Sequence, residues 1–197
     1  MVIADIFRPA STRAIVKAAY DAALVLATSL FVTLMARISI RLPFSPVPIT
    51  GQTLAVLLAG ALLGSVRGSL SLGLYLFWGL LGLPVFAGGT GGLARLAGPT
   101  GGYLVGFVFA AYTTGFLAQR GWDRRVSTCL LAMAIGNAVI YFFGLPWLAA
   151  FVGTDRVIHL GLLPFIPGDV VKLLFATALL PGGWRLLALC GLEGRGK

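Results

Sequence analysis

Long apolar stretches separated by short polar or glycine-rich connections run through the whole chain. A helix that crosses a bilayer needs about 20 apolar residues, and several stretches are shorter, which is typical of tilted helices or of a site that indents one side. The pattern predicts an all-α integral membrane protein with six transmembrane helices and a glycine-rich loop on its outer side. The six stretches cover residues 20–38, 50–63, 68–83, 100–119, 127–148 and 169–180, with a further apolar piece to 189.

Composition supports this division. Of the 197 residues, 58% are hydrophobic and only 11% are charged, with a mean hydropathy of +0.97, whereas a soluble domain carries roughly 25% charged residues. We interpret residues 1–19 as an amphipathic N-terminal segment on the cytoplasmic side. Residues 20–189 form one membrane domain with a substrate pocket on its outer side, and residues 190–197 form a cytoplasmic tail.

The net charge of +9 reflects topology rather than binding to nucleic acid, because the basic residues lie in the connections and form no stripe. With a cytoplasmic N-terminus, ten Lys or Arg residues fall in inner regions, as the positive-inside rule requires. We expect a multi-pass protein of a bacterial or archaeal cell membrane, the inner membrane where there are two, with both termini in the cytoplasm. The four outer basic residues are Arg37, Arg41, Arg95 and Arg156.

A glycine-dense stretch, residues 84–105, connects the third and fourth apolar segments. Glycine allows positive φ angles and close approach of the backbone to a bound molecule. Irregular backbone at membrane depth is tolerated only where protein buries it or where it lines a cavity. The stretch therefore predicts a small-molecule site built partly from main-chain groups, and we include Tyr103 among its candidate residues.

Asp169 and Lys172 lie three residues apart, on one face of the predicted last helix. Ionisable residues inside a membrane usually face a cavity or each other. Pro167 and Gly168 mark a helix start, where a carboxylate suits the positive end of the dipole but an ammonium needs an acceptor. We favour a ligand site over the alternative, a helix cap beside a lysine that extends to the membrane surface.

Two further polar pairs interrupt the apolar segments. Asn137 and Tyr141 are four residues apart, and they bond either a ligand or a neighbouring helix. Gln52 is kept as a candidate ligand residue, although packing is an equally simple role for it and for Thr53. No Ser-His-Asp set, catalytic carboxylate pair or metal-ligand cluster can be assembled, so we expect neither an enzyme nor a resident cofactor or metal.

Small residues recur at four-residue spacing at the start of the first apolar segment. Such a strip lets another helix approach closely, either within the chain or as a docking face for a partner subunit. The residues of this alanine strip are Ala14, Ala18, Ala19, Ala22, Ala23 and Ala27.

Several long motifs, in order along the chain, closely resemble the BioY family. These proteins are the biotin-binding S components of energy-coupling factor (ECF) transporters and have six membrane helices, so the resemblance implies an S-component-like bundle. The motifs are Pro-Val-Pro-Ile-Thr at 46–50, the run at 52–64, Gly-Leu-Pro-Val-Phe-Ala-Gly-Gly at 82–89, Gly-Pro-Thr-Gly-Gly-Tyr at 98–103 and Gly-Asp-Val-Val-Lys at 168–172.

The resemblance implies high-affinity capture of biotin from outside and uptake with a transmembrane coupling protein and two ATPases, which alone bind ATP. Asp169 and Lys172 match the family's acid and lysine and would bond the ureido group or the carboxylate of biotin, and Phe86 and Tyr141 would cover its ring. The alternatives are an S component for another vitamin, such as thiamin or riboflavin, or a solitary facilitator or secondary transporter of biotin. The glycine loop implied to line the pocket contains Phe86, Gly88, Gly89, Thr90, Gly91 and Gly92.

Overall fold

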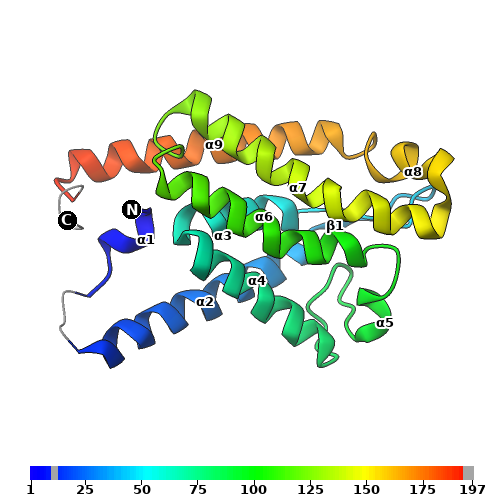
Figure 1. The fold of residues 1–197 in the computed structure, drawn as a ribbon, viewed down its shortest axis with the longest axis horizontal. Helices are drawn as coiled ribbons and strands as arrows, with labels where there is room; N and C mark the ends of the chain where they lie inside the picture. Colours follow the sequence, from blue (N-terminus) through cyan, green and yellow to red (C-terminus); the bar gives the residue numbers. More distant parts are fainter. Residues whose placement is uncertain (10–12, 193–197) are drawn as a thin grey trace.

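Six helices run back and forth roughly along the long axis of the molecule in the computed structural model, which describes residues 1–9 and 13–192 (Figure 1). They correspond to the six apolar stretches of the sequence. Three short helices and a two-stranded antiparallel hairpin complete the described part. The six long elements are α2 (Ala14–Arg37), α3 (Gln52–Leu63), α4 (Ser65–Leu80), α6 (Gly101–Gln119), α7 (Val126–Val152) and α9 (Ile166–Leu189). The short ones are α1 (Ile3–Ile6), α5 (Leu93–Leu96), α8 (Thr154–Gly161), β1 (Ser39–Ile40) and β2 (Ile49–Thr50).

Four of these helices, α2, α6, α7 and α9, are long and apolar enough to cross a membrane. Helix α3 is apolar but has 12 residues, so it spans roughly 18 Å of a hydrocarbon core about 30 Å thick. Helix α3 therefore leaves part of the hydrocarbon core unspanned beyond its first residue, Gln52. Loops and a site at membrane depth can occupy that part. This geometry agrees with the indentation that the short apolar stretches predict.

The two ends of the bundle differ in character (Figure 1). The N-terminus, the end of α9 and the α6–α7 turn lie at one end, and the amine of Met1 lies 3.4 Å from the carbonyl oxygen of Gln119. The other end holds the β1–β2 hairpin, α5 and α8, and we call it the hairpin end. Ser39 pairs with Thr50 and Ile40 with Ile49 in that hairpin.

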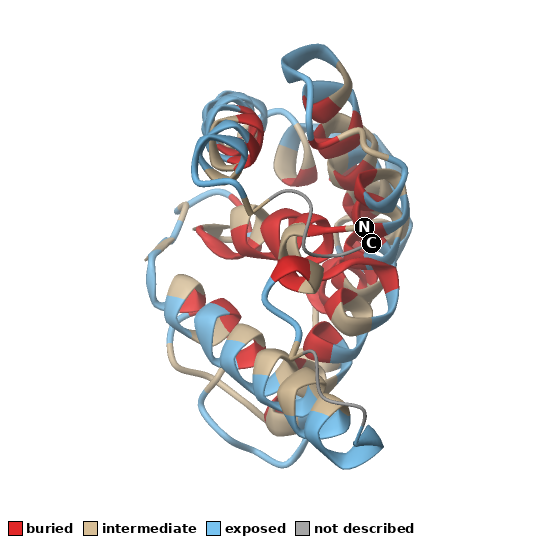
Figure 2. Ribbon diagram, turned by 90° about the vertical axis from the view of Figure 1, so that its left-hand side faces the viewer, coloured by how far each residue is buried: buried red, intermediate tan, exposed pale blue. Residues whose placement is uncertain are grey.

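Helix α3 forms the centre of the bundle. Nine of its twelve residues are buried, and the buried residues gather in the middle of the end view (Figure 2). Gly60 permits close contact with α6, because a Cβ atom there would lie 2.3 Å from the Ala111 carbonyl oxygen. Helix α2 lies at the periphery and buries only Ser29, Val32 and Ala36. Its other residues are half-buried or exposed.

Residues 1–19, interpreted from the sequence as an amphipathic segment, include α1 and the start of α2. Helix α2 already begins at Ala14, and the first residues fold under the bundle, where Val2, Ala4 and Ile6 are buried. Arg67 of α4 holds this region through Asp5 at 2.8 Å. The apolar side of residues 2–6 thus packs into the core. The expected tail, 190–197, lies outside the described residues from 193 onward.

Two further boundaries differ from the expected ones. Helix α9 continues to Leu189 with Pro181 inside it, where the sequence indicated a break after residue 180. Helices α5 and α8 were not expected, because four or eight residues are too few to give a clear periodic pattern. Both contribute to the hairpin end, where they shape the walls of the site.

Candidate functional site

A cavity lies at the hairpin end, between the β1–β2 connection, the glycine loop and helices α3, α6, α7 and α9. It encloses about 600 Å³ of space, including its open mouth. The lining residues are Val47, Pro48, Thr50, Gln52, Thr53, Phe86, Ala87, Arg95, Thr100, Tyr103, Leu104, Phe107, Ile140, Tyr141, Phe165, Asp169 and Lys172.

Asp169, in the first turn of α9, forms the polar centre of the cavity. Its carboxylate is buried, and its Oδ2 atom accepts hydrogen bonds from Asn137 Nδ2 at 3.1 Å and from the hydroxyl of Tyr141. Asn137 and Tyr141 lie one turn apart on α7 and therefore face α9 together. A buried carboxylate needs such donors, because an unpaired charge in an apolar surrounding is costly.

Lys172 completes this polar centre from the next turn of α9. Its ammonium group lies 3.3 Å from Asp169 Oδ1 and donates to the hydroxyl of Thr53 at 2.8 Å. The acid and the amine neutralise each other, so this end of the cavity has no net charge. It offers acceptors and donors to a ligand group that is polar and uncharged.

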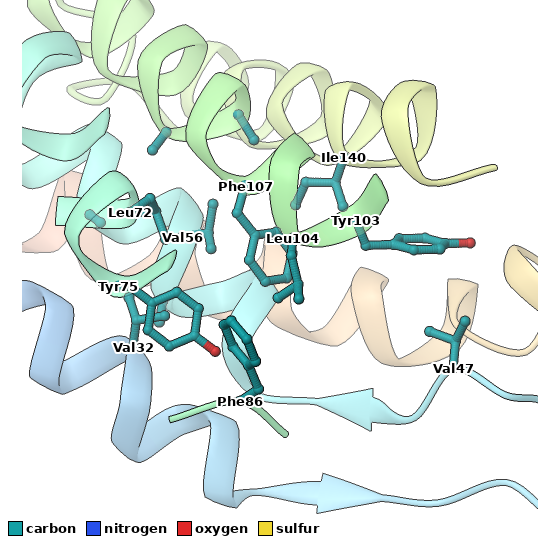
Figure 3. Packing of buried hydrophobic residues seen from close by; sticks show 14 of the residues in the cluster. Val32, Val47, Val56, Leu72, Tyr75, Phe86, Tyr103, Leu104, Phe107 and Ile140 are labelled. Atoms are coloured by element: carbon teal, nitrogen blue, oxygen red, sulfur yellow. The ribbon is translucent and has the colours of Figure 1, made fainter. Parts of the chain in front are cut away.

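Aromatic side chains form the apolar walls (Figure 3). Phe86 is buried and meets Tyr75 edge to face, with ring centroids 5.5 Å apart. Gln52 donates to the hydroxyl of Tyr75 at 2.6 Å, which in turn donates to the carbonyl of Val85 at 3.2 Å. These hydrogen bonds thus hold the segment around Val85, which precedes the glycine loop, against α3 and α4.

The opposite wall is tied to α8. The rings of Tyr103 and Tyr141 meet edge to face at 6.2 Å, and the hydroxyl of Tyr103 donates to the Gly161 carbonyl at 2.9 Å. Ser45 donates to the carbonyl of Leu160 at 2.7 Å. Helix α8 therefore fixes both α6 and the β1–β2 connection around the mouth of the cavity.

The structure brings together about half of the candidate residues drawn from the sequence. Asn137 lies behind the cavity wall and reaches the site through Asp169. The candidates that line the cavity directly are Gln52, Phe86, Tyr103, Tyr141, Asp169 and Lys172.

The glycine loop takes another place. Gly88 and Thr90 line a neighbouring hollow, whereas Gly89, Gly91 and Gly92 do not line the cavity. Gly88 and Gly89 have φ angles of +73° and +71°, which a tight turn requires and side chains disfavour. A Cβ atom on Gly91 would lie 2.2 Å from the carbonyl oxygen of Leu83. Here glycine permits close packing of the loop on its own chain rather than contact with the cavity.

Several lining residues were not among the sequence candidates. Phe107 lies one turn after Tyr103 on α6, and Phe165 lies one turn before Asp169, so their spacing from candidate residues was a usable signal. Thr100 carries a buried hydroxyl that has no hydrogen-bond partner among the described residues. Arg95 was counted only as a basic residue of an outer connection, and nothing in the local sequence distinguished it from the other three.

The fold and the site define a helical membrane protein with a ligand cavity, part aromatic and part ionic, at one end of its bundle. Its similarity to known proteins shows the family. The chain belongs to the BioY family, whose model matches residues 9–189.

Its similarity to individual proteins extends over most of their length. The chain is 42% identical to the biotin transporter BioY of Rhizobium etli, covering 86% of this chain and 91% of that protein. It is 44% identical to the probable biotin transporter BioY of Pyrococcus horikoshii, over 77% and 89% of the two chains. The crystal structure of an S-component for biotin from an ECF-type ABC transporter matches with a TM-score of 0.77 and 26% identity, covering 89% of this chain and 95% of that one. These relatives are transporters, as expected for a chain that is not an enzyme.

Proposed function

We propose that this chain captures biotin and serves as the substrate-binding subunit of an ECF-type transporter. The observation that carries the proposal is the buried Asp169–Lys172 pair in an aromatic cavity, in a family whose similar members are biotin transporters. Biotin has an uncharged ureido head with two N–H donors and one carbonyl acceptor, an apolar thioether ring and a carboxylate tail. A neutral acid–amine pair complements such a head.

The hydrogen bonds between the ureido group of biotin and the Asp169–Lys172 pair would be charge-assisted and therefore about twice as strong as neutral ones. Asp169 would accept a ureido N–H, and Lys172 would donate to the ureido oxygen. The rings of Phe86 and Tyr141 lie on the cavity walls and would cover the thioether ring. Because Asp169 and Lys172 bond each other, biotin would share or replace that contact.

The hairpin end faces outward in this proposal. The basic residues support that orientation, since the turn between α6 and α7 at the opposite end carries Arg120, Arg124 and Arg125. Cytoplasmic connections are enriched in such residues. Biotin would then enter from outside, and both termini would lie in the cytoplasm.

The alanine strip would dock the transmembrane coupling protein, which joins two ATPases that bind the ATP. All six alanines of the strip are exposed on α2, so packing within the described chain does not use them. A strip of small side chains allows a partner helix to come close in the membrane. The chain itself would contribute no ATP site, and uptake would depend on the added subunits.

Mass spectrometry of the small molecule that co-purifies with the detergent-solubilised chain tests the substrate. Biotin is the expected ligand, and titration should show biotin binding without competition from thiamin or riboflavin. Recovery of another vitamin that competes with biotin would overturn the proposal in favour of a different S component. Uptake of biotin into liposomes by the chain alone would support the solitary transporter instead.

A further inference from the structure

A second hollow adjoins the cavity at the hairpin end, and we call it the vestibule. Its polar side chains come from the β1–β2 connection, the glycine loop and α5, and include Ser39, Arg41, Thr90 and Arg95. Pro48, Ala87 and Arg95 line both the vestibule and the cavity. The two spaces are therefore adjacent, and Arg95 borders both of them.

The vestibule is positively charged. Within residues 1–9 and 13–192, neither Arg41 nor Arg95 forms an ion pair. No Asp or Glu of the described chain lines this hollow. Arg95 is half-buried, and a guanidinium removed from water in this way gains from an anionic partner. Arg37 nearby differs, because it donates to the Pro84 carbonyl at 2.8 Å.

The lack of a side chain at Gly88 allows the guanidinium of Arg41 to lie close to the loop. A Cβ atom there would lie 3.0 Å from Arg41 Nη2, and the residue has a φ of +73°. The loop thus leaves room for a guanidinium beside its backbone.

Thr100 adds a second, independent indication of a ligand at this side of the cavity. Its side chain is buried, with 8% exposure, it lines the cavity, and its hydroxyl has no partner in the described structure. Buried hydroxyls are normally hydrogen-bonded. Like Arg95, it belongs to the segment that joins the glycine loop to α6.

The charges of the cavity indicate which ligand group belongs there. Of the described residues, Asp169, Lys172 and Arg95 are the charged ones that line it. The first two neutralise each other, so the cavity as a whole carries one excess positive charge, at Arg95. It is complementary to a ligand with a neutral polar head at one end and a single anionic group at the other.

We infer that Arg95, with the hydroxyl of Thr100, binds the carboxylate of the ligand, that Arg41 adds positive charge in the adjoining vestibule, and that Asp169 and Lys172 hold the uncharged head. The inference rests on the proposed function and deepens it, because it assigns the carboxylate to the vestibule side rather than to Lys172. Guanidinium groups suit carboxylates because their paired N–H groups match the two oxygens. The chain then selects the free acid over amide-linked forms of the same molecule.

Titration of biotin and of its primary amide into the solubilised protein tests this assignment. The amide keeps the head and the chain of biotin but loses the charge. The unchanged protein is expected to bind the acid about tenfold more tightly than the amide, since hydrogen bonds to charged groups are worth that much. Arg95→Gln should reduce this preference to near one and leave the affinity for the amide unchanged. Arg156→Gln, an exposed arginine of α8 outside both hollows, is the matched control and should keep the preference.

The contrary results are distinct. Equal binding of acid and amide by the unchanged protein, or an undiminished preference in Arg95→Gln, would overturn the inference while leaving biotin binding in place. Loss of amide binding in Arg95→Gln would also overturn it, because Arg95 would then support the cavity itself. Failure of the unchanged protein to bind either molecule would instead remove the proposed function.

Discussion

The ammonium nitrogen of Lys172 lies 2.8 Å from the hydroxyl oxygen of Thr53, 119 positions earlier in the chain. The contact joins α9 to the first turn of α3 at the floor of the cavity. Lys172 also donates to Asp169, on the same helix, at 3.3 Å. Thr53 is therefore the residue that fixes the ammonium group across the helix interface.

Replacing Thr53 by valine removes this acceptor and keeps the shape of the side chain. We expect biotin binding to weaken about tenfold, because the loss of a hydrogen bond to a charged group costs about 1.5 kcal/mol. Titration calorimetry measures the effect. Thr113→Val is the matched control, since the Thr113 hydroxyl bonds the Phe109 carbonyl within α6. Unchanged affinity in Thr53→Val would show that Lys172 needs no positioning from α3.

The glycine loop offers a test of packing. Gly91→Ala would place a Cβ atom 2.2 Å from the carbonyl oxygen of Leu83, and backbone cannot give way as a flexible side chain can. We expect the thermal midpoint to fall, with a cost of about 1–3 kcal/mol typical of overpacking. Gly73→Ala on α4, where nothing lies within 4 Å, should leave the midpoint unchanged. Equal midpoints for both variants would mean that the loop adapts freely.

The alanine strip can be tested separately from the ligand site. Ala18→Leu enlarges an exposed residue of α2 and should prevent a partner helix from approaching closely. We expect biotin binding to be retained, while co-purification with the coupling protein and the ATPases is lost. Ala150→Leu, at an exposed position of α7, serves as control. A complex that forms equally well with both variants would place the docking face elsewhere.

Asp123, in the turn between α6 and α7, predicts a dependence of stability on pH. Its side chain is buried and accepts a hydrogen bond from Trp184 Nε1 at 2.6 Å. Burial raises the pKa of Asp123 above its ordinary value, and the bond from Trp184 opposes this only in part. A raised pKa in the folded state means that the carboxyl stabilises the fold most below its ordinary pKa. This contribution is lost as the pH rises through the raised value.

Asp123→Asn should therefore reduce the change of the unfolding free energy with pH at acidic pH. It should also make the protein more stable than the unchanged one above the raised pKa. Thermal unfolding at a series of pH values measures this. The exposed Asp155→Asn provides the comparison and should follow the unchanged protein. A profile of Asp123→Asn that is just as steep would assign the pH dependence to other groups.

The sequence predicted the membrane fold well because hydropathy is a property of long segments. All six stretches became helices, and Asp169, Lys172 and Tyr141 stood out as polar groups in apolar surroundings. Hydropathy did not show where α2 begins, since the start of this helix carries Lys17 among alanines and does not look apolar. Burial of Val2 depends on tertiary packing that no local pattern records.

The site was harder to predict where its residues are ordinary in type. Phe107 and Phe165 are two of 13 phenylalanines in the chain, and their spacing of one turn from Tyr103 and Asp169 was the one signal that set them apart. Arg95 looked like one basic loop residue among four until the structure brought it to the edge of the cavity. The glycine loop stays a prediction as a ligand site, since Gly88 and Thr90 line the vestibule, although a positive φ at Gly88 and close packing at Gly91 also give these glycines a structural role.

The central claim is that the Asp169–Lys172 pair holds the ligand, and calorimetric titration of biotin into the double variant Asp169→Asn, Lys172→Ala tests it most directly. Both charges are removed together, so no unpaired buried charge remains to destabilise the fold. The control pair Asp155→Asn, Arg156→Ala removes one acid and one basic residue at exposed positions of α8. The account predicts that the first variant purifies normally and binds no biotin, whereas the control binds as the unchanged protein does. Undiminished biotin affinity in the first variant would contradict it.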